Sequence, residues 1–396
     1  MEEEPKKIRE PHRISEELDT VDRHRLLVDI FLFVDEFSLS ESTGNDDRKL
    51  DMKKLRVGIL GATGSVGQRF VALLSDHPWF TVTALAASEK SAGKPYRNAV
   101  NWKMATPIPD DVARLVIMEA SPPLPCDLVF SGLDASVAGE IEEAFAKSGY
   151  PVISNSKNHR MDSDVPLLIP EVNADHIDII LSQKRNRHYT AGFIVTNPNC
   201  SVVGLTIALK PLHDTFGVER VHVVTMQALS GAGFPGVASM DITDNVIPYI
   251  GGEEEKLETE PQKILSTPIL ISAQCNRVPV TDGHLEAVSV KLTKKATLEE
   301  VKEALRSFRG EPQKLHLPSA PEYPIVVMDE DNRPQPRLDR NLENGMAVSV
   351  GRIRPCSLLD YKFIVLSHNT IRGAAGAAIL NAELLHKRGL LSRRTL

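Results

Sequence analysis

A glycine-rich turn constrains the fold of this 396-residue chain more than any other feature of the sequence. The turn, GATGSVG, lies between a short apolar run, LRVGIL, and an amphipathic segment, SVGQRFVALLSDHP. A strand, a glycine turn and a helix in this order open a βαβ unit, in which the glycines permit a tight turn and a close approach of the backbone to a ligand. The sequence therefore predicts a parallel sheet that begins near residue 55.

The same turn predicts a dinucleotide site. Its spacing is G-x-x-G-x-x-G rather than the commoner G-x-G-x-x-G. The helix that follows would offer its free amides and the positive end of its dipole to a pyrophosphate. The residues that we expect to contact the cofactor are Gly61, Thr63, Gly64, Ser65, Val66 and Gly67.

The end of the second predicted strand indicates which dinucleotide binds. An NAD site usually carries an acidic residue about twenty residues after the turn, where it accepts from the ribose hydroxyls. Here the segment LAASEKSAGK has Ser88 near that position and Ser91 after it, with two lysines close by. Hydroxyl and ammonium groups suit a 2′-phosphate, which favours NADP(H), whereas Glu89 leaves a plain solvated loop open as the alternative.

Two folded parts follow from the pattern along the chain. Strands and helices alternate up to residue 199, whereas the later apolar runs are longer strands joined by few helices, and the C-terminal segment returns to helix. We expect an α/β fold: a Rossmann-type dinucleotide-binding domain, residues 53–199 and 370–396, and an α+β catalytic and oligomerisation domain with a largely antiparallel sheet, residues 200–369. Small residues near 373–378 would let the last helix pack closely on another backbone.

Residues 1–52 are predicted to form an extension that is disordered or loosely docked. Residues 1–50 hold 14 Asp and Glu against 8 Lys and Arg, so they carry −6 of the formal net charge of −7. Their apolar stretch, LLVDIFLFV, contains Asp29 and is too short to span a membrane. The composition matches neither a signal nor a transit peptide, so we expect a cytoplasmic protein.

The remaining composition excludes several classes of protein. No basic patch marks a nucleic-acid surface. The four cysteines are far apart, without a C-x-x-C or H-E-x-x-H motif, so we expect a reducing compartment, no disulfide framework and no metal.

Cys200 stands where a catalytic thiol would be useful. In FIVTNPNCSVVG it follows a predicted strand and turn and begins a long apolar helix. The dipole and free amides of a helix N-terminus stabilise a thiolate and can hold an oxyanion. His284, after the turn in RVPVTDGH, is the candidate acid or base. Taken singly, a buried inert cysteine and a surface histidine are the commoner interpretations.

Six motifs in order resemble the aspartate-semialdehyde dehydrogenase family, and its fungal and archaeal branch most closely. They are GATGSVGQRF, NPNCS, MQALSGAGFPG, EEEKLETEPQKIL, RVPVTDGH and HNTIRGAAG. The resemblance covers about residues 53–390. It implies a fold similar to that of glyceraldehyde-3-phosphate dehydrogenase and a homodimer or homotetramer.

The resemblance also implies site residues. Cys200 matches the acyl-accepting nucleophile, Gln227 a residue that positions substrate and thiol, and His284 the general acid and base. The residues matched to substrate binding are Arg277 for the carboxylate, Glu253 for the amino group, Lys256 and Arg97 with Asn98 for the phosphate, and Gly231 in the loop Ser230–Gly233. Asn369 matches a residue of the nicotinamide pocket.

The implied reaction is NADPH-dependent reduction of L-aspartyl 4-phosphate to L-aspartate 4-semialdehyde, with release of inorganic phosphate, in lysine, threonine and methionine biosynthesis. It would proceed through a thioester on Cys200. The alternatives within enzymes are a malonyl-CoA reductase, an N-acetylglutamyl-phosphate reductase or a glyceraldehyde-3-phosphate dehydrogenase. A non-catalytic NADP-binding protein is the alternative outside them. Neither a nucleic acid nor a membrane is an expected partner.

Overall fold

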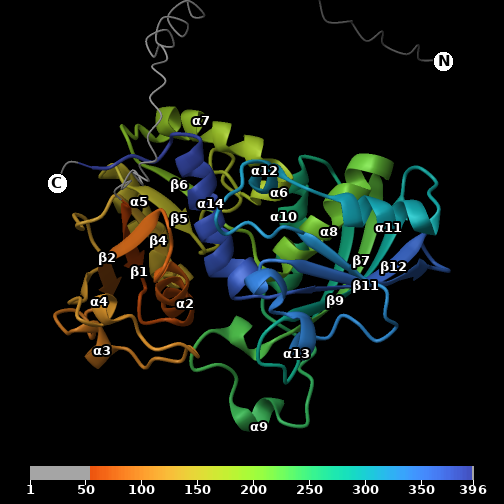
Figure 1. Ribbon diagram of the computed structural model, residues 1–396, viewed down its shortest axis with the longest axis horizontal. Coiled ribbons are helices and arrows are strands. Elements are labelled where there is room, and N and C mark those ends of the chain that lie inside the picture. Colours follow the sequence, from red (N-terminus) through yellow and green to blue (C-terminus); the bar gives the residue numbers. More distant parts are fainter. Residues whose placement is uncertain (1–53, 395–396) are drawn as a thin grey trace, which may run out of the picture. The chain divides into compact units, whose positions relative to one another are not determined.

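The computed structural model describes residues 54–394, which contain two six-stranded sheets (Figure 1). The predicted extension, residues 1–52, lies outside the described residues. The described chain belongs to one compact unit, Met52–Leu396, so the predicted domain boundaries within it stay a prediction.

The first sheet is wholly parallel, as the glycine turn predicts. Its strand order is β3-β2-β1-β4-β5-β6, and each neighbouring pair runs in the same direction. The strands are β1 (Leu55–Leu60), β2 (Phe80–Ala87), β3 (Met118–Glu119), β4 (Leu128–Ser131), β5 (Pro151–Ser154) and β6 (Phe193–Thr196). The helices of this part are α2 (Ser65–Leu74), α3 (Tyr96–Ala99), α4 (Asp110–Ala113), α5 (Ala135–Lys147), α6 (Pro170–Asn173), η1 (Ala174–Asp178) and α7 (Ile179–Arg187).

The second sheet is mixed, with antiparallel pairs at its centre and a parallel pair at each edge. Its order is β10-β11-β12-β9-β7-β8. The strands are β7 (Val218–Gln227), β8 (Leu270–Arg277), β9 (His284–Leu292), β10 (Ile325–Met328), β11 (Val348–Pro355) and β12 (Tyr361–Ser367). The predicted class is confirmed, with the correction that the sheet's edges are parallel.

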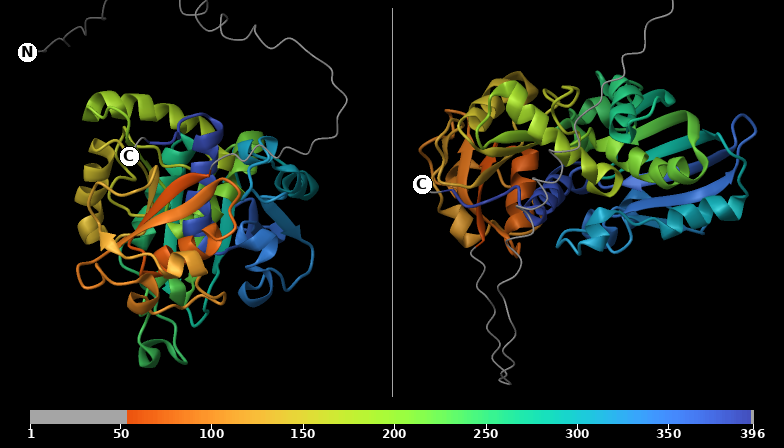
Figure 2. Two further views of the ribbon diagram at one scale, coloured as in Figure 1. Left: turned by 60° about the vertical axis from the view of Figure 1, so that its left-hand side comes forward. Right: turned by 90° about the horizontal axis from the view of Figure 1, so that it is seen from above.

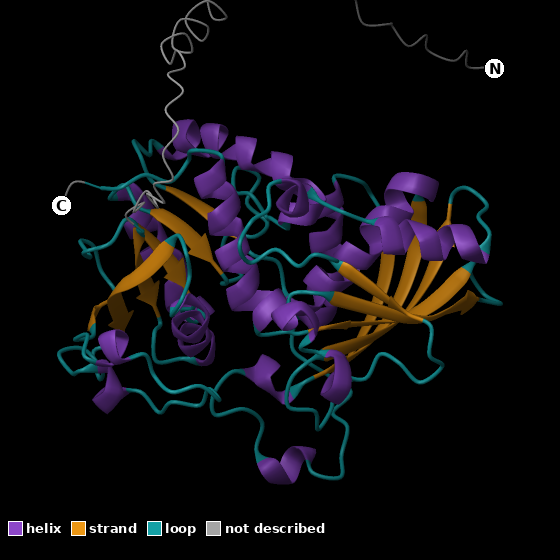
Figure 3. Cartoon of the chain, in the orientation of Figure 1, coloured by secondary structure: helices purple, strands orange, loops and turns teal. Residues whose placement is uncertain are grey.

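Helices lie between and around the sheets (Figure 3). The long helix α8 (Cys200–Phe216) is buried over most of its length and packs on β7, β9 and β12. The others are η2 (Leu229–Ala232), α9 (Ser239–Ile242), α10 (Glu253–Leu265), α11 (Leu298–Ser307), α12 (Glu311–Lys314), α13 (Pro336–Asp339), η3 (Leu342–Gly345), the π-helical turn η4 (Ile371–Ala375) and α14 (Gly376–Lys387). The segment that carries α9 projects from the body (Figures 1 and 2).

The C-terminal segment returns to the first sheet and touches the start of α8. Apolar residues of α14 belong to the same core as β1 and α2. A Cβ on Gly373 would lie 2.7 Å from Cβ of Cys200, so only glycine lets the two backbones approach this closely. The predicted close packing by small residues is therefore present.

The glycine turn gives the first testable prediction. A Cβ on Gly67 would lie 2.3 Å from the carbonyl oxygen of Gly61, whereas one on Gly64 would lie 3.4 Å from it. We expect Gly67→Ala to lower the free energy of unfolding by about 1–3 kcal/mol, because helix and turn must move apart. Gly64→Ala is the matched control and should change it by less than about 1 kcal/mol. Urea unfolding of both variants checks this, and equal effects would contradict it.

Candidate active site

Strand β6 and helix α8 place Cys200 as predicted, at the first position of a helix. The residue before it, Asn199, caps this helix: its side-chain oxygen accepts hydrogen bonds from the amides of Ser201, at 3.0 Å, and Val202, at 3.4 Å. Those two amides are therefore occupied. The expectation that free amides of the helix start hold an oxyanion is wrong for them.

Cys200, which is half-buried, and His284 form a pair. The Sγ atom of Cys200 lies 3.1 Å from Nε2 of His284, and His284 is fully buried. The pair depends on the register of the second sheet, because β9 begins at His284 and packs against α8. Two residues 84 positions apart in sequence thus lie within hydrogen-bonding distance of each other.

The backbone of Ala228, just after β7, holds two of the predicted residues. Its amide donates to Nδ1 of His284 at 3.0 Å, and its carbonyl accepts from Nη1 of Arg277 at 2.6 Å. The predicted loop residue Gly231 lies over both side chains: a Cβ there would be 2.8 Å from Arg277 Nη1 and 3.2 Å from His284 Nε2. The loop therefore approaches the pair with backbone alone, as predicted.

Glu253 is a buried carboxylate whose charge acts on the Cys200 sulfur. It accepts from Lys256 at 2.6 Å, from Asn199 at 2.8 and 3.0 Å, and from Gln227 at 3.3 Å. Burial would raise the pKa of Glu253, but Lys256 and the amide donors outweigh it, so that the pKa lies below its usual value. Glu253 is therefore an ionised group, and Gln227 and Lys256 belong to its surroundings.

The protonation of the pair differs from the expectation. Desolvation of the sulfur and the nearby charge of Glu253 raise the pKa of Cys200 to about 12, although Arg160, Arg277 and Lys256 oppose this. Burial, together with the charge of Arg277, lowers the pKa of His284 to about 3. Without ligands the pair is thus a neutral thiol beside a neutral imidazole. Desolvation thus opposes the thiolate that the helix start is predicted to favour, and that prediction stays a prediction.

Arg160 is the functional candidate that sequence reasoning missed. It is buried, its charge acts on the Cys200 sulfur, and it is held by Glu260 at 3.0 Å and by the carbonyl of Asn155 at 2.8 Å. The segment NSKNHRMDSD has no periodic or glycine signal that would have singled it out. A buried arginine whose positive charge acts on the thiol suits an anionic substrate group.

Arg97 and Asn98 do not join this cluster. Both are exposed on α3, in the first sheet's part of the molecule, and Arg97 donates weakly, at 3.4 Å, to the carbonyl of Ala113. Within residues 54–394, no hydrogen bond connects either of them to Cys200 or Glu253. Arg160, and neither Arg97 nor Asn98, is therefore among the residues whose charge acts on the Cys200 sulfur.

The residues predicted for the dinucleotide fit that group. Helix α2 begins at Ser65 with Gly64 as its N-cap, and no side chain occupies its first amides, in contrast to α8. Gly61 has a φ of 75°, which favours glycine, and its amide donates to Ala86 at the end of β2. Ser88 and Ser91 follow β2 directly and lie in the turn beside this one. Thr63, Val66 and Gly67 complete the turn.

Asn369 links the loop that begins at Ser230 to the turn that precedes His284. Its side chain donates to Ser230 Oγ at 2.8 Å and accepts from the amide of Gly283 at 2.9 Å, next to His284. Gly233 approaches the first residue of α2, since a Cβ on it would lie 3.7 Å from Ser65 Oγ. The loop from Ser230 to Gly233 therefore spans from the thiol to the predicted cofactor helix.

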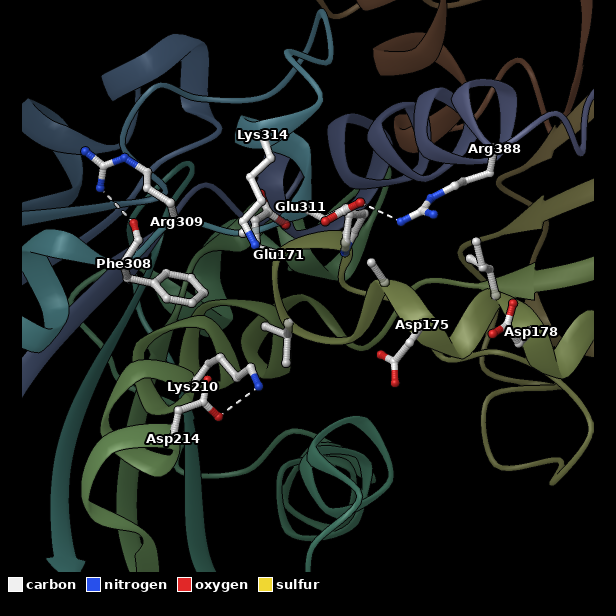
Figure 4. Close-up of a pocket in the computed structure, with 15 residues that line it drawn as sticks. Glu171, Asp175, Asp178, Lys210, Asp214, Phe308, Arg309, Glu311, Lys314 and Arg388 are labelled. Carbon is white, nitrogen blue, oxygen red and sulfur yellow. Dashed lines mark hydrogen bonds and ion pairs between the residues drawn. The ribbon is translucent and has the colours of Figure 1, made fainter. Parts of the chain in front are cut away.

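The other three cysteines differ from Cys200 in their surroundings. All four cysteines are free, and burial raises the pKa of Cys126 to about 12 and that of Cys275 to about 11. Cys356 is half-buried, and backbone hydrogen bonds from Leu359 and Leu358 lower the pKa of its thiol. No group of three or more His, Cys, Asp or Glu in residues 54–394 is placed to hold a metal ion, and no helix there is long and apolar enough to cross a membrane. A separate cavity of about 440 Å³ beside α6 and α12 is lined by ion pairs, among them Lys210–Asp214 and Arg388–Glu311, and lacks the thiol (Figure 4).

A parallel sheet with a glycine turn, joined to a mixed sheet that carries a thiol and an imidazole, is the arrangement of a dinucleotide-dependent dehydrogenase with a cysteine nucleophile. Comparison with known families agrees. Residues 56–180 match the model of a semialdehyde dehydrogenase, NAD binding domain, and residues 209–372 that of a semialdehyde dehydrogenase, dimerisation domain.

Individual relatives identify the family within this class of dehydrogenases. The chain is 52% identical over 353 residues to an aspartate-semialdehyde dehydrogenase of Schizosaccharomyces pombe, covering 85% of this chain and 99% of that protein. One from Methanothermobacter thermautotrophicus is 50% identical over 346 residues, 84% of this chain and 99% of that protein. The crystal structure of the Candida albicans enzyme with NADP matches with a TM-score of 0.79 and 46% identity, over 85% of this chain and 100% of that one. The chain belongs to the aspartate-semialdehyde dehydrogenase family.

The raised pKa of Cys200 predicts how the free enzyme reacts with alkylating agents. Because the thiolate is the reactive form, alkylation by iodoacetamide should be slow at pH 7 and rise about tenfold per pH unit up to pH 10, without a plateau. Mass spectrometry of the Cys200 peptide measures the rate of its alkylation. In Cys200→Ala, the alkylation of the protein that remains measures the contribution of Cys356. A plateau at or below pH 8 would show that the thiolate forms far more easily than this geometry implies.

Proposed function

We propose that this enzyme reduces L-aspartyl 4-phosphate to L-aspartate 4-semialdehyde with NADPH, through a thioester on Cys200, in lysine, threonine and methionine biosynthesis. The observation that supports this most is the Cys200–His284 pair, at 3.1 Å, in the field of one ionised carboxylate and three cations. Membership of the family supports the same substrate.

Each charged group of the substrate has a matching residue near the thiol. Arg277 suits the α-carboxylate, since its planar fork can bind both oxygens. Glu253 suits the α-ammonium group, and Lys256 with Arg160 suits the phosphate. A coenzyme A thioester has no ammonium group for Glu253, so the charge pattern favours the aminoacyl phosphate over malonyl-CoA.

The chain's own residues divide the work as follows. Cys200 attacks the acyl carbon and releases phosphate, and Gln227 and Asn199 hold Glu253 in place for the substrate. NADPH, when bound at the α2 turn, supplies the hydride that reduces the thioester. His284 is the hydrogen-bonding partner of the sulfur throughout. The loop at Gly231 approaches Arg277 and His284 with backbone alone, since a side chain there would meet both.

We also propose a homo-oligomer in the cytoplasm. Support for the oligomer comes from the match of residues 209–372 to a dimerisation domain and from the projecting segment around α9. Met240 and Tyr249 in that segment are 89% and 68% exposed. Exposed apolar side chains gathered on one segment are typical of an interaction surface. The cytoplasmic location rests on the sequence alone.

The first test is absorbance of reduced nicotinamide with purified protein, L-aspartate semialdehyde and NADP. NADPH should form only when inorganic phosphate is present, NAD should be a poor substitute, and Cys200→Ala should abolish turnover while leaving NADP affinity within about twofold. No change in absorbance with semialdehyde, together with oxidation of NADPH by malonyl-CoA, would identify the protein as a malonyl-CoA reductase instead. No change in absorbance with either substrate would support a non-catalytic NADP-binding protein.

A second prediction separates the two candidate phosphate arginines. Arg160→Gln should raise KM for phosphate about tenfold or more, because a buried charge-assisted contact is lost. Arg97→Gln is the matched control and should change it less than about twofold, because the side chain is exposed on α3. Steady-state kinetics with varied phosphate measures both. The reverse order of effects would restore the family-based assignment of Arg97.

A further inference from the structure

The motif EEEKLETEPQKIL contains the same pair of residues twice. Glu253 and Lys256 form the first Glu-x-x-Lys pair. Glu260 and Lys263 form the second, seven positions later. In the helix α10 this spacing puts all four side chains on one face. The charges of the first pair act on the Cys200 sulfur, whereas the second pair has no role in the reaction proposed above.

The carboxylate of Glu260 holds two donors that come from different parts of the chain. Its Oε1 atom accepts from Nη1 of Arg160 at 3.0 Å, and its Oε2 atom accepts from the backbone amide of Asn199 at 2.7 Å. Glu260 is only 2% exposed, so water hardly competes for either oxygen. Arg160 contributes positive charge at the sulfur, and Asn199 immediately precedes Cys200. One buried carboxylate thus binds a charged side chain of the site and the backbone that leads into the nucleophile.

Lys263 fixes the backbone of the segment that carries Arg160. Its ammonium group donates to the carbonyl oxygens of Arg160 and Asp162, both at 2.7 Å, and of Val165 at 2.8 Å. An ammonium group has three donors, so all of them are used. Burial lowers the pKa of Lys263 to about 8, so the group carries its proton at pH 7. Since residues 155–165 form neither helix nor strand, these bonds tie the backbone of the segment to α10.

Asn199 connects the two carboxylates of this helix face. Its side-chain amide donates to Glu253 at 2.8 and 3.0 Å, and its backbone amide donates to Glu260. Its side-chain oxygen also caps α8, which begins at Cys200. The start of the helix that carries the thiol is therefore bound to α10 at two points, one turn and then another along the same face.

We propose, on the basis of the function proposed above, that Glu260 is a positioning residue of the active site. It keeps Arg160 and the start of α8 in a fixed relation, so that the guanidinium can bind the substrate phosphate while Cys200 attacks the acyl carbon. Lys263 supports the same arrangement through the backbone that follows Arg160. Glu260 acts through the two donors that it holds, and the roles of Cys200 and His284 are unchanged.

The charge of Glu260 also limits the effect of Arg160 on the sulfur. A carboxylate bound to a guanidinium offsets part of the field of that guanidinium at a third group. Glu260→Gln leaves the charge of Arg160 unopposed, so the thiolate of Cys200 should form more easily. Arg160→Gln removes that charge, so the thiolate should form less easily. A site that is merely loosened would expose the thiol in both variants, and would therefore change both in the same direction.

Alkylation of Cys200 by iodoacetamide at pH 8 measures this difference without any substrate. Because the thiolate is the reacting form, we expect Glu260→Gln to react about threefold or more faster than the wild type, and Arg160→Gln about threefold or more slower. Glu255→Gln is the matched control on the same helix and should change the rate less than about 1.5-fold, because Glu255 is exposed. Any other pattern, such as faster alkylation in both variants, would overturn the proposal.

Kinetics with varied phosphate test the positioning itself. Glu260→Gln should raise KM for phosphate about fivefold or more, because an amide has one oxygen and cannot accept from both donors. If Glu260 acts through Arg160, the double variant of Glu260→Gln and Arg160→Gln should match the KM of Arg160→Gln within about twofold. Effects on KM that multiply in the double variant would contradict the proposal.

Glu260→Asp keeps the proposal testable if Glu260→Gln does not fold, which circular dichroism shows. The aspartate keeps the charge but is one methylene shorter, so it cannot reach both donors. We expect KM for phosphate to rise about threefold or more while the alkylation rate stays within about twofold of the wild type. An unchanged KM would overturn the proposal. The expected alkylation rates, together with a wild type that does not turn over L-aspartate semialdehyde, would reject the proposed function and leave the coupling of Glu260 to Cys200 in place.

Discussion

The register of four strands in the second sheet determines where the chemistry occurs. Gln227 of β7 lies beside Arg277 of β8, and His284 of β9 lies beside Ser367 of β12. These residues come from separate parts of the sequence, yet all four stand at strand ends on the same end of the sheet. Since a slip of one residue in any strand would turn its side chains to the other face, the backbone hydrogen bonds of this sheet specify the site.

The electrostatics of the site follow from its burial. A dry environment raises the pKa of the thiol and lowers that of the imidazole, so the resting pair carries no charge. Charge is instead held by Glu253 and by Arg160, Arg277 and Lys256, all of which act on the sulfur and have hydrogen-bonding partners of their own. In such a site the thiol stays in its unreactive protonated form until a bound ligand changes the charges around it.

Features of the fold and the site that depend on a few neighbouring residues could be predicted from the sequence. The glycine turn, the parallel sheet, the position of Cys200 at a helix start and the close packing near Gly373 all depend on short patterns, and all are found. The cap on α8 was readable as well, because asparagine before a helix commonly occupies its first amides. Its consequence for the thiolate was not drawn from the sequence.

Contacts between residues far apart in the sequence could not be predicted from motifs or periodicity. Arg160 lies forty residues before Cys200 and has no periodic neighbours, so only the folded chain shows that its charge acts on the sulfur. The pKa values of the pair likewise depend on burial, which no motif reports. The His284 ring is likewise held by a backbone amide, that of Ala228, which follows the end of β7.

The contact between Gly373 and Cys200 couples the thiol to the core of the first sheet. The turn η4, which backs the thiol, continues directly into α14, whose apolar residues share a core with β1 and α2. The position of the sulfur therefore depends on how α14 is seated, and a change in the packing of that helix would reach the thiol through the backbone.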